Sequence, residues 1–391
     1  MKIPISKNWF GPEELEAIQQ PLIDGWVVQG KQVRRFEQAF SAFTHANESI
    51  ACSSGTAAIQ IACAALGMTP SDEVVVPAFT WVATPNVVEL LGAKAVFCDI
   101  ELDSFNVDSK QLAQCVTSRT VGLVPVHLFG LCAEMDEVNS IAKKHALWVV
   151  EDAACGLGSW YRGRHAGTIG DAGCFSFHPR KSVTTGEGGM VTVMNRELAP
   201  LLDGLRNHGA VPATSTALGN LGHSSLLPSY SIAGFNYRLT DIQGALGAAQ
   251  MLRLDFLLAE RKRCAEYYNQ ALADVEWLRL PKFASHHQHA WQSYVTLFAP
   301  SEPSMAAVSH LHDQRNRFMK HLEAAGVSTR QGTHAPAHLE YYVNKYGYRP
   351  EDFPNAYIAD KLSLALPVFP GMTEEELAYV VDGVKNYDPA D

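Results

Sequence analysis

The chain has 391 residues, with 31 Lys plus Arg against 41 Asp plus Glu, so its formal net charge is −10. Hydrophobic residues make up 47% and charged residues 18%, a globular composition that excludes an intrinsically disordered protein. The acidic balance excludes a general nucleic-acid binder, which needs a basic face, although a local pocket can still hold a small anion.

The eight cysteines give no sign of a metal site or a disulfide framework. None forms a C-x-x-C pair or belongs to a Cys/His cluster with zinc-finger spacing, so we expect free thiols in a reducing compartment and no metal. The apolar stretches are too short to span a bilayer. Residues 1–6 lack the apolar core of a secretion signal. We therefore expect a soluble cytoplasmic protein without a membrane or nucleic-acid partner.

The first half of the chain alternates short apolar runs with helical patterns. The runs are residues 74–76, 95–100, 121–126 and 147–150, and the helical segments are residues 56–66, 84–91, 108–116 and 135–146. Continuous apolar strands separated by helices indicate βαβ units, and thus a parallel sheet covered on both faces. Ligands bind beyond the carboxyl ends of the strands in such sheets, so the residues just after each run are candidates for a site.

The pattern changes after residue 170. Two strand-like runs, residues 174–177 and 190–193, are too close in sequence for an ordinary helical crossover. Residues 211–230 show no clear period and predict a long loop, which in a compact domain is usually functional or mobile. A long amphipathic helix is expected from Thr240 to about Gln270.

The C-terminal third predicts a strand around residues 291–299 and helices over 304–325 and 373–386. At about 150 residues per domain the length is enough for two or three domains. We therefore predict a large domain over residues 1–250 and a smaller α+β domain over residues 251–391.

Three short segments carry candidate chemistry. Ser54, Gly55 and Thr56 precede a helix, whose free N–H groups and dipole suit a phosphate, although an ordinary N-cap would look the same. Asp152 ends a strand and is equally compatible with a ring-nitrogen partner, a metal ligand or a helix N-cap. Lys181 could form a Schiff base if burial or the neighbouring Arg180 lowered its pKa, but most lysines are solvated.

Together these three segments supply what pyridoxal 5′-phosphate (PLP) needs. The phosphate would bind at the helix start, the pyridine nitrogen at Asp152 and the aldehyde at Lys181. A fourth segment, residues 234–241, adds the polar donors Asn236 and Arg238 before the long helix, where a capped loop is the alternative.

Several motifs in this order resemble the DegT/StrS-type sugar aminotransferases, within the aspartate-aminotransferase fold (fold type I) of PLP enzymes. The matching stretches are GWVVQG (25–30), SSGTAA (53–58), PAFTWVAT (77–84), EDAA (151–154), FSFHPRK (175–181), TTGEGG (184–189), RNHG (206–209) and GFNYRL (234–239). The resemblance implies an α/β fold with a mostly parallel seven-stranded sheet in the large domain, plus a smaller α+β C-terminal domain.

The resemblance also implies roles for individual residues. Lys181 would form the Schiff base and Asp152 would keep the ring nitrogen protonated, as the two catalytic residues. The other implied cofactor contacts are Ser54, Gly55 and Thr56 at the phosphate, Ser176 with a hydroxyl, Trp81 stacked on the ring, Cys155 beside it, and Asn236 on the phosphate of a neighbouring subunit. The implied substrate contacts are Trp26, His208, Arg238 and His338. A homodimer with shared active sites follows from the role of Asn236.

Two positions distinguish this chain among its apparent relatives. Cys155 stands where the family often has Gln, His or Glu, and a thiol is a weak hydrogen-bonding group. Relatives that dehydrate sugars often have His where this chain has Lys181, so Lys181 favours transamination over a PLP-dependent sugar dehydratase. A non-catalytic PLP-binding regulator would normally carry a basic DNA-binding segment, and none is apparent.

The implied reaction moves an amino group from L-glutamate to a keto sugar. The acceptor would be a nucleotide-linked keto-deoxyhexose or a keto sugar acid such as 8-keto-3-deoxy-octulosonate, and the product an amino sugar for a cell-surface polysaccharide or related glycoconjugate. The loops at residues 25–35, 160–165, 211–230 and 331–345 are expected to form the substrate pocket. Arginines suit an anionic substrate; the candidates are Arg34, Arg35, Arg162, Arg164 and Arg330.

Overall fold

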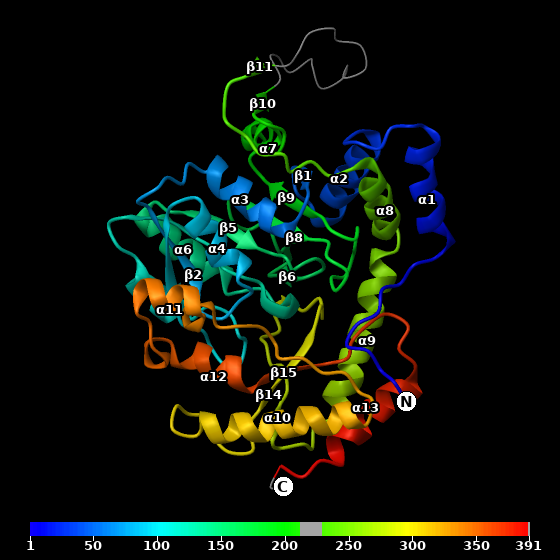
Figure 1. Ribbon diagram of the computed structural model, residues 1–391, viewed down its shortest axis with the longest axis vertical. Helices are drawn as coiled ribbons and strands as arrows, with labels where there is room; N and C mark the ends of the chain where they lie inside the picture. Colours follow the sequence, from blue (N-terminus) through cyan, green and yellow to red (C-terminus); the bar gives the residue numbers. More distant parts are fainter. Residues whose placement is uncertain (212–228, 390–391) are drawn as a thin grey trace.

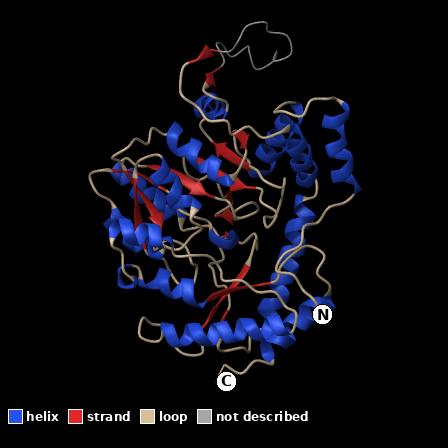
Figure 2. Cartoon of the chain, in the orientation of Figure 1, coloured by secondary structure: helices blue, strands red, loops and turns tan. Residues whose placement is uncertain are grey.

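A computed structural model describes residues 1–211 and 229–389 of the chain (Figure 1). A large sheet with helices on both sides occupies the upper part of the view, and a smaller sheet with its own helices lies below it (Figure 2). Both termini lie at the lower, C-terminal part. Within the described ranges, none of the helices combines the length and apolar character needed to cross a membrane.

The large sheet has seven strands in the order β1-β9-β8-β5-β4-β2-β3. Their bounds are β1 (Glu48–Cys52), β2 (Glu73–Pro77), β3 (Lys94–Cys98), β4 (Thr120–Leu123), β5 (Trp148–Asp152), β8 (Ala172–Ser176) and β9 (Gly189–Val193). Strand β9 runs antiparallel to both β1 and β8, and the other adjacent pairs are parallel. The mostly parallel seven-stranded sheet is therefore confirmed.

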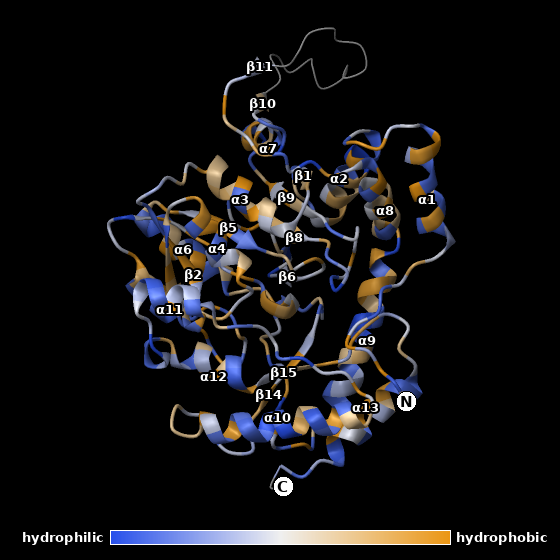
Figure 3. Ribbon diagram, viewed as in Figure 1, coloured by the Kyte–Doolittle hydropathy of each residue, from blue (hydrophilic) through white to orange (hydrophobic). Residues whose placement is uncertain are grey.

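Helices cover both faces of this sheet. They are α2 (Lys31–Thr44), α3 (Gly55–Ala65), α4 (Ala83–Leu90), α5 (Ser109–Leu112), α6 (Met135–His145) and α7 (Ala199–Arg206), whereas α1 (Pro12–Ile23) packs mainly on α8 (Asp241–Met251). Successive residues of β2 face opposite sides: Val74 and Val76 belong to the buried cluster that contains residues of α3 and α4, whereas Val75 belongs to the cluster that contains residues of α2 and α6. Burial on both faces explains why the strands read as continuous apolar runs. The surface helices α1 and α10 (Val308–Ala324) show mixed hydropathy instead (Figure 3).

The predicted long helix after Thr240 is interrupted. Helix α8 (Asp241–Met251) and helix α9 (Leu254–Ala271) are separated by Leu252 and Arg253, whose N–H groups bond three residues back instead of four. The Arg253 side chain is paired with Glu13 and Glu14 of α1. The single-helix prediction is therefore wrong, because the backbone at Arg253 (φ −108°, ψ 3°) leaves the helical region.

The C-terminal part contains a second sheet. Strand β14 (Tyr294–Phe298) pairs antiparallel with β12 (Leu278–Arg279) and β15 (Ser363–Leu366). Its helices are α10 (Val308–Ala324), α11 (Glu340–Tyr346), α12 (Pro354–Leu362) and α13 (Glu374–Lys385), which confirms the predicted strand and both predicted helices. The division at residue 250 stays a prediction; Ile3 bridges Val327, so the first residues pack on the C-terminal part.

Two short sheets complete the described elements. Strands β6 (Trp160–Tyr161), β7 (Arg164–His165) and β13 (His287–Gln288) form one of them, with β6 in the centre. Strands β10 (Ala210–Val211) and β11 (Ser229–Tyr230) pair antiparallel as the other. Most of the loop predicted over residues 211–230 lies outside the described residues.

Candidate active site

A cavity of about 570 Å³ lies where the carboxyl ends of the large sheet meet the C-terminal part. Ser54 follows β1, Asp152 ends β5 and Ser176 ends β8, and all three line the cavity. Arg330 and His334 line it from the C-terminal part. The volume is in the range of small-molecule sites, and its position agrees with the strand-end rule used above.

The start of α3 forms one wall of the cavity. The Ser54 hydroxyl accepts a hydrogen bond from the Ala57 N–H at 3.1 Å and so caps the helix. The N–H groups of Gly55 and Thr56 precede the first intrahelical bond and remain available for an anion. A Cβ on Gly55 would lie 2.8 Å from the Ser176 Cβ, so glycine allows the helix start to approach β8. The capping and phosphate-binding interpretations of Ser54 are therefore compatible.

Asp152 presents its carboxylate to the cavity at the end of β5. Oδ2 accepts a hydrogen bond from the Thr84 hydroxyl at 2.6 Å, and Oδ1 accepts one from the Ala154 N–H at 3.1 Å. The residue is only 5% exposed. No helix begins after it, because residues 153–159 are turns, so the N-cap alternative is wrong. A buried carboxylate with capacity left for another donor suits a protonated ring nitrogen.

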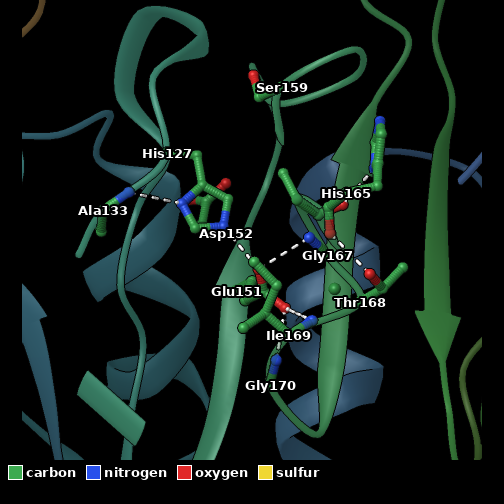
Figure 4. A network of polar contacts seen from close by, with 12 residues as sticks. His127, Ala133, Glu151, Asp152, Ser159, His165, Gly167, Thr168, Ile169 and Gly170 are labelled. Atoms are coloured by element: carbon green, nitrogen blue, oxygen red, sulfur yellow. Dashed lines mark hydrogen bonds and ion pairs between the residues drawn. The ribbon is translucent and has the colours of Figure 1, made fainter. Parts of the chain in front are cut away.

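The adjacent Glu151 points to the opposite side of β5, into a polar network shown in Figure 4. His127 Nε2 lies 2.7 Å from its Oε2, and the ring's Nδ1 accepts a hydrogen bond from the Ala133 N–H, which assigns the proton to Nε2. The other donors to Glu151 are the backbone N–H groups of Gly167, Ile169 and Gly170. Burial raises the pKa of Glu151, but these hydrogen bonds outweigh it and the net pKa is lowered.

Lys181 lies in the connection between β8 and β9, residues 177–188. Its Nζ donates a hydrogen bond to the Cys155 Sγ at 3.0 Å, and both groups line the cavity. The antiparallel pairing of β8 and β9 confirms that this short connection is not a helical crossover. The lysine is half-buried, with its backbone held by a hydrogen bond from its own N–H to the His178 carbonyl oxygen.

Trp81 supplies an aromatic wall. The side chain is 54% exposed although it lines the cavity, and its ring centroid lies 5.9 Å from that of His334. This tryptophan is therefore not part of the buried core. An exposed indole face inside a cavity is a suitable surface on which to stack a flat ring.

Of the predicted cofactor contacts, eight line the cavity of the single chain: Ser54, Gly55, Thr56, Trp81, Asp152, Cys155, Ser176 and Lys181. Asn236 does not; its backbone bridges Asn207. It was expected to reach a neighbouring subunit, so its role stays a prediction.

The four predicted substrate contacts also lie outside the cavity lining. Trp26 is exposed and donates its Nε1–H to the Gln29 carbonyl oxygen at 3.3 Å. Arg238 donates to the Asn207 side chain at 2.8 Å, and His208 adopts a positive φ of 58° after α7. Their roles toward a substrate stay predictions.

His338 is replaced at the cavity by a neighbouring histidine. The 3-10 turn Pro336–His338 places the His338 ring against Phe353 and Tyr357, and burial lowers its pKa. His334, four residues earlier, lines the cavity instead. The sequence alone could not tell which of these two histidines, four residues apart in one loop, faces the cavity.

The sequence interpretation gave no ligand-binding role to several other polar cavity residues, among them His178, Arg180, Glu187 and Gln292. Three of them, His178, Arg180 and Glu187, lie in the two motifs at and just after Lys181. Their proximity to Lys181 in the sequence could therefore have identified them as cavity residues. Of the five candidate arginines, Arg330 lines the cavity and the other four do not.

One group outside the cavity has ligand-like geometry. Within the part of the chain that the structure describes, Glu134, His286 and His287 are the group of three whose ligand atoms could share a metal ion. Glu134 lies 2.8 Å from the His287 Nε2 and 3.3 Å from the His286 Nε2, which already gives its carboxylate two donors. The expectation of no metal site stays a prediction.

Comparison with known proteins gives consistent matches along the chain. The model of the DegT/DnrJ/EryC1/StrS aminotransferase family matches residues 9–385. The spore coat polysaccharide biosynthesis protein SpsC of Bacillus subtilis is 34% identical over 388 residues, covering 98% of this chain and 96% of SpsC. An uncharacterised protein of Methanocaldococcus jannaschii, MJ1066, is 33% identical over 385 residues, covering 98% of this chain and 97% of MJ1066.

A solved structure has the same fold. The putative sugar aminotransferase Spr1654 from Streptococcus pneumoniae, in its PMP-form, superposes with a TM-score of 0.90 at 27% identity, covering 98% of both chains. Its PLP-form gives a TM-score of 0.89 at 26% identity.

Proposed function

The chain belongs to the DegT/DnrJ/EryC1/StrS aminotransferase family of PLP-dependent enzymes, and from this premise we propose that it transfers an amino group from L-glutamate to a keto sugar. The acceptor is a nucleotide-linked keto-deoxyhexose or a keto sugar acid such as 8-keto-3-deoxy-octulosonate. The product is an amino sugar for a cell-surface polysaccharide or a related glycoconjugate. The observation that carries this proposal is the convergence of Lys181, Asp152 and the start of α3 on one cavity.

The residues present fit PLP at its phosphate, its ring nitrogen and its aldehyde. The free N–H groups at the start of α3 and the Ser176 hydroxyl suit its phosphate, and the lack of a Cβ at Gly55 leaves room between them. Asp152 suits its ring nitrogen and the exposed Trp81 face suits its ring. Lys181 Nζ is the cavity amine that would bind its aldehyde. When bound, PLP stabilises the negative charge that develops on the carbon next to the transferred nitrogen.

The residues of the chain then have distinct tasks. Lys181 Nζ would act as the base that takes the proton from the Cα of the amino donor, and as the acid that gives this proton back on the cofactor side of the transferred nitrogen. Asp152 would hold the ring nitrogen protonated, with Thr84 and Ala154 fixing the orientation of its two oxygens. Cys155 is a weak hydrogen-bonding group beside the lysine, so it constrains the position of Nζ less than an amide would.

The amino-sugar assignment has support from relatives. SpsC is named a spore coat polysaccharide biosynthesis protein, and Spr1654 is described as a putative sugar aminotransferase. We further propose a cytoplasmic homodimer in which Asn236 contributes to the neighbouring site. The exposed apolar side chains of the N-terminal segment, Leu22, Ile23, Trp26, Val27 and Val28, are compatible with such an interface.

A half-reaction assay tests this function. The PLP-loaded protein is mixed with L-glutamate, and conversion is followed by the loss of the absorbance band that borohydride abolishes. The amine-loaded protein is then offered a panel of nucleotide-linked keto-deoxyhexoses and keto sugar acids. Conversion by L-glutamate and reversal by one member of the panel is the expected result. Conversion of the cofactor without reversal by any keto sugar would contradict the acceptor class.

A further inference from the structure

Three side chains that can bind a metal meet outside the active-site cavity. Glu134 directly precedes α6, whereas His286 and His287 lie in the connection between β12 and β14, residues 280–293. One ligand atom from each side chain lies within 4.8 Å of the other two. The cavity lining includes none of the three, and the proposed transamination gives them no task.

The local backbone turns both histidines toward the same carboxylate. Neighbouring residues of a strand point to opposite faces, but His286 lies in a turn that is closed by a hydrogen bond from the His287 N–H to the Ala284 carbonyl oxygen. The His287 backbone pairs with Tyr161 of β6. The His286 carbonyl oxygen accepts a hydrogen bond from the Arg162 N–H at 2.9 Å. The two imidazoles are thereby held with their ring centroids 4.4 Å apart.

The distances between the three groups suit a single bound ion. The His287 Nε2 lies 2.8 Å from the Glu134 Oε1, and the His286 Nε2 lies 3.3 Å from the Glu134 Oε2. Zinc bonds to nitrogen and oxygen are about 2.0–2.2 Å long, so neighbouring ligand atoms of a tetrahedral site lie roughly 3.3–3.6 Å apart. Small side-chain rotations are enough to reach this spacing.

The surroundings of Glu134 favour a cation at this point. Glu134 is the N-cap residue of α6, but its carboxylate makes no cap hydrogen bond and faces the histidines instead. The Tyr161 hydroxyl donates a hydrogen bond to its Oε2 at 3.1 Å, the kind of contact that orients a carboxylate ligand. The nearby Arg162 guanidinium is paired with Asp136 at 2.8 Å, which compensates its positive charge.

The protonation states are also compatible with a metal. In the metal-free chain, Nε2–H groups of the two histidines can donate to Glu134. The Nδ1 of His287 is buried and has no hydrogen-bond partner in the part of the chain that the structure describes, so no bond opposes transfer of the ring proton to it. The Nε2 lone pair is then available. Above pH 7 most imidazoles are neutral and glutamates ionised, which are the forms that bind a metal.

We propose that Glu134, His286 and His287 bind one Zn²⁺ ion. Two imidazole nitrogens and one carboxylate are a zinc ligand set, whereas Mg²⁺ and Ca²⁺ prefer oxygen ligands. The side chains of Glu134 and His286 are 37% and 26% exposed, so water can take the fourth position. The cysteine pattern predicted no metal, and this site uses no cysteine.

The ion fastens the 280–293 connection to the start of α6. This connection joins two strands of the second sheet, whereas α6 covers the large sheet. Gln292 of the same connection donates a hydrogen bond to the Arg180 carbonyl oxygen at 2.9 Å, next to Lys181. The zinc is therefore a structural ion that holds the two parts of the molecule together near the cavity. Since it binds the folded chain, it raises the thermal midpoint.

Zinc titration of the PLP-loaded protein, first stripped with EDTA, tests the site. A chromophoric chelator competes for Zn²⁺, and one ion bound per chain is expected. Glu134→Gln, His286→Gln and His287→Gln should each weaken binding by at least about 100-fold, and Tyr161→Phe, which removes only a hydrogen bond to a ligand, by about tenfold. His310→Gln, at an exposed position on α10, is the matched control and should leave the zinc affinity unchanged.

X-ray absorption at the zinc edge of the loaded wild type needs no variant. A four-coordinate shell of nitrogen and oxygen with scattering from two imidazoles is expected, and a shell of sulfur or of oxygen alone overturns the site. Unchanged zinc affinity in all three ligand variants also overturns it. The thermal midpoint should rise with one equivalent of zinc and return in EDTA, and an unchanged midpoint overturns the structural role. None of these measurements uses the glutamate reaction, so failure of the proposed function is distinguishable from failure of this site.

Discussion

Glu151 and Asp152 are neighbours in sequence at the end of β5, yet they belong to opposite regions of the molecule. Glu151 is fully buried and receives hydrogen bonds from His127 and three backbone N–H groups. Asp152 faces the cavity and receives two, from Thr84 and Ala154. The difference arises because successive side chains of a strand point to opposite faces.

The comparison shows how to separate a structural carboxylate from a functional one. The donors to Glu151 come from the loops at residues 127 and 167–170, so this carboxylate ties both loops to the strand (Figure 4). Asp152 keeps capacity for a ligand in a cavity that also contains Lys181. Both carboxylates are buried. Only Asp152, which has fewer hydrogen-bond donors from the protein than Glu151, has an oxygen available to a bound ligand.

Lys181→Ala is expected to produce the largest change on the cavity side. Loss of the amine removes both cofactor attachment and proton transfer, so the rate should fall by about 10⁴-fold or more. Glutamate half-reaction rates measure this, and the thermal midpoint checks that the fold is intact. Near-wild-type transamination would remove Lys181 from its role.

Asp152→Asn should lower the half-reaction rate by about 10²–10³-fold, since an amide cannot hold the ring nitrogen protonated. The amide can still accept the hydrogen bond from Thr84, so the unfolding transition should change little. The rate is measured at saturating glutamate. An unchanged rate would assign the ring-nitrogen role to another residue.

Glu151→Gln reverses the pattern and gives the matched control for Asp152→Asn. The NH₂ group of the new Gln would face backbone N–H donors that now give their hydrogen bonds to the carboxylate, so some of these donors would lose their acceptor. The free energy of unfolding should therefore fall by about 2–3 kcal/mol. Rates per folded molecule should stay within about threefold of wild type. Denaturant titration gives the first quantity. A large rate loss without destabilisation would mean that the two carboxylates are not functionally separate.

The smallest expected effect concerns acid stability on the Glu151 side. Burial lowers the pKa of His165 from 6.5 to about 4, and the Gly158 N–H donates to its Nε2, which requires the neutral ring. Because the folded-state pKa lies below the unfolded one, stability is complete above about pH 6.5 and falls as the pH drops toward 4.

His165→Gln should therefore reduce the slope of unfolding free energy against pH by up to about 1.4 kcal/mol per unit between pH 6 and 4.5. The slope is measured by urea titration at several pH values, so a uniform loss of stability does not affect the result. His289, with a pKa lowered by burial to about 3, contributes to the remaining slope together with the other groups whose pKa is lowered, such as Glu151 and His287. An identical slope in the variant would show that His165 does not titrate on unfolding.

Much of the fold was predictable because it depends on local pattern. The apolar runs became β2, β3, β4 and β5, and the intervening helical segments became α3, α4, α5 and α6. The pairing of Arg253 with Glu13 and Glu14, at the break between α8 and α9, was not predictable, since it joins residues about 240 positions apart.

The candidate site divides in the same way. The amino-acid sequence by itself determined the groups with a required chemistry, Lys181, Asp152 and the small residues before α3, because residue type and position at a strand or helix end fix what each can bind. Only the tertiary structure decided that His334 and not His338 lines the cavity, and that Arg330 meets Arg180 there. Such choices depend on how a distant loop packs against the sheet, and local periodicity carries no information about that packing.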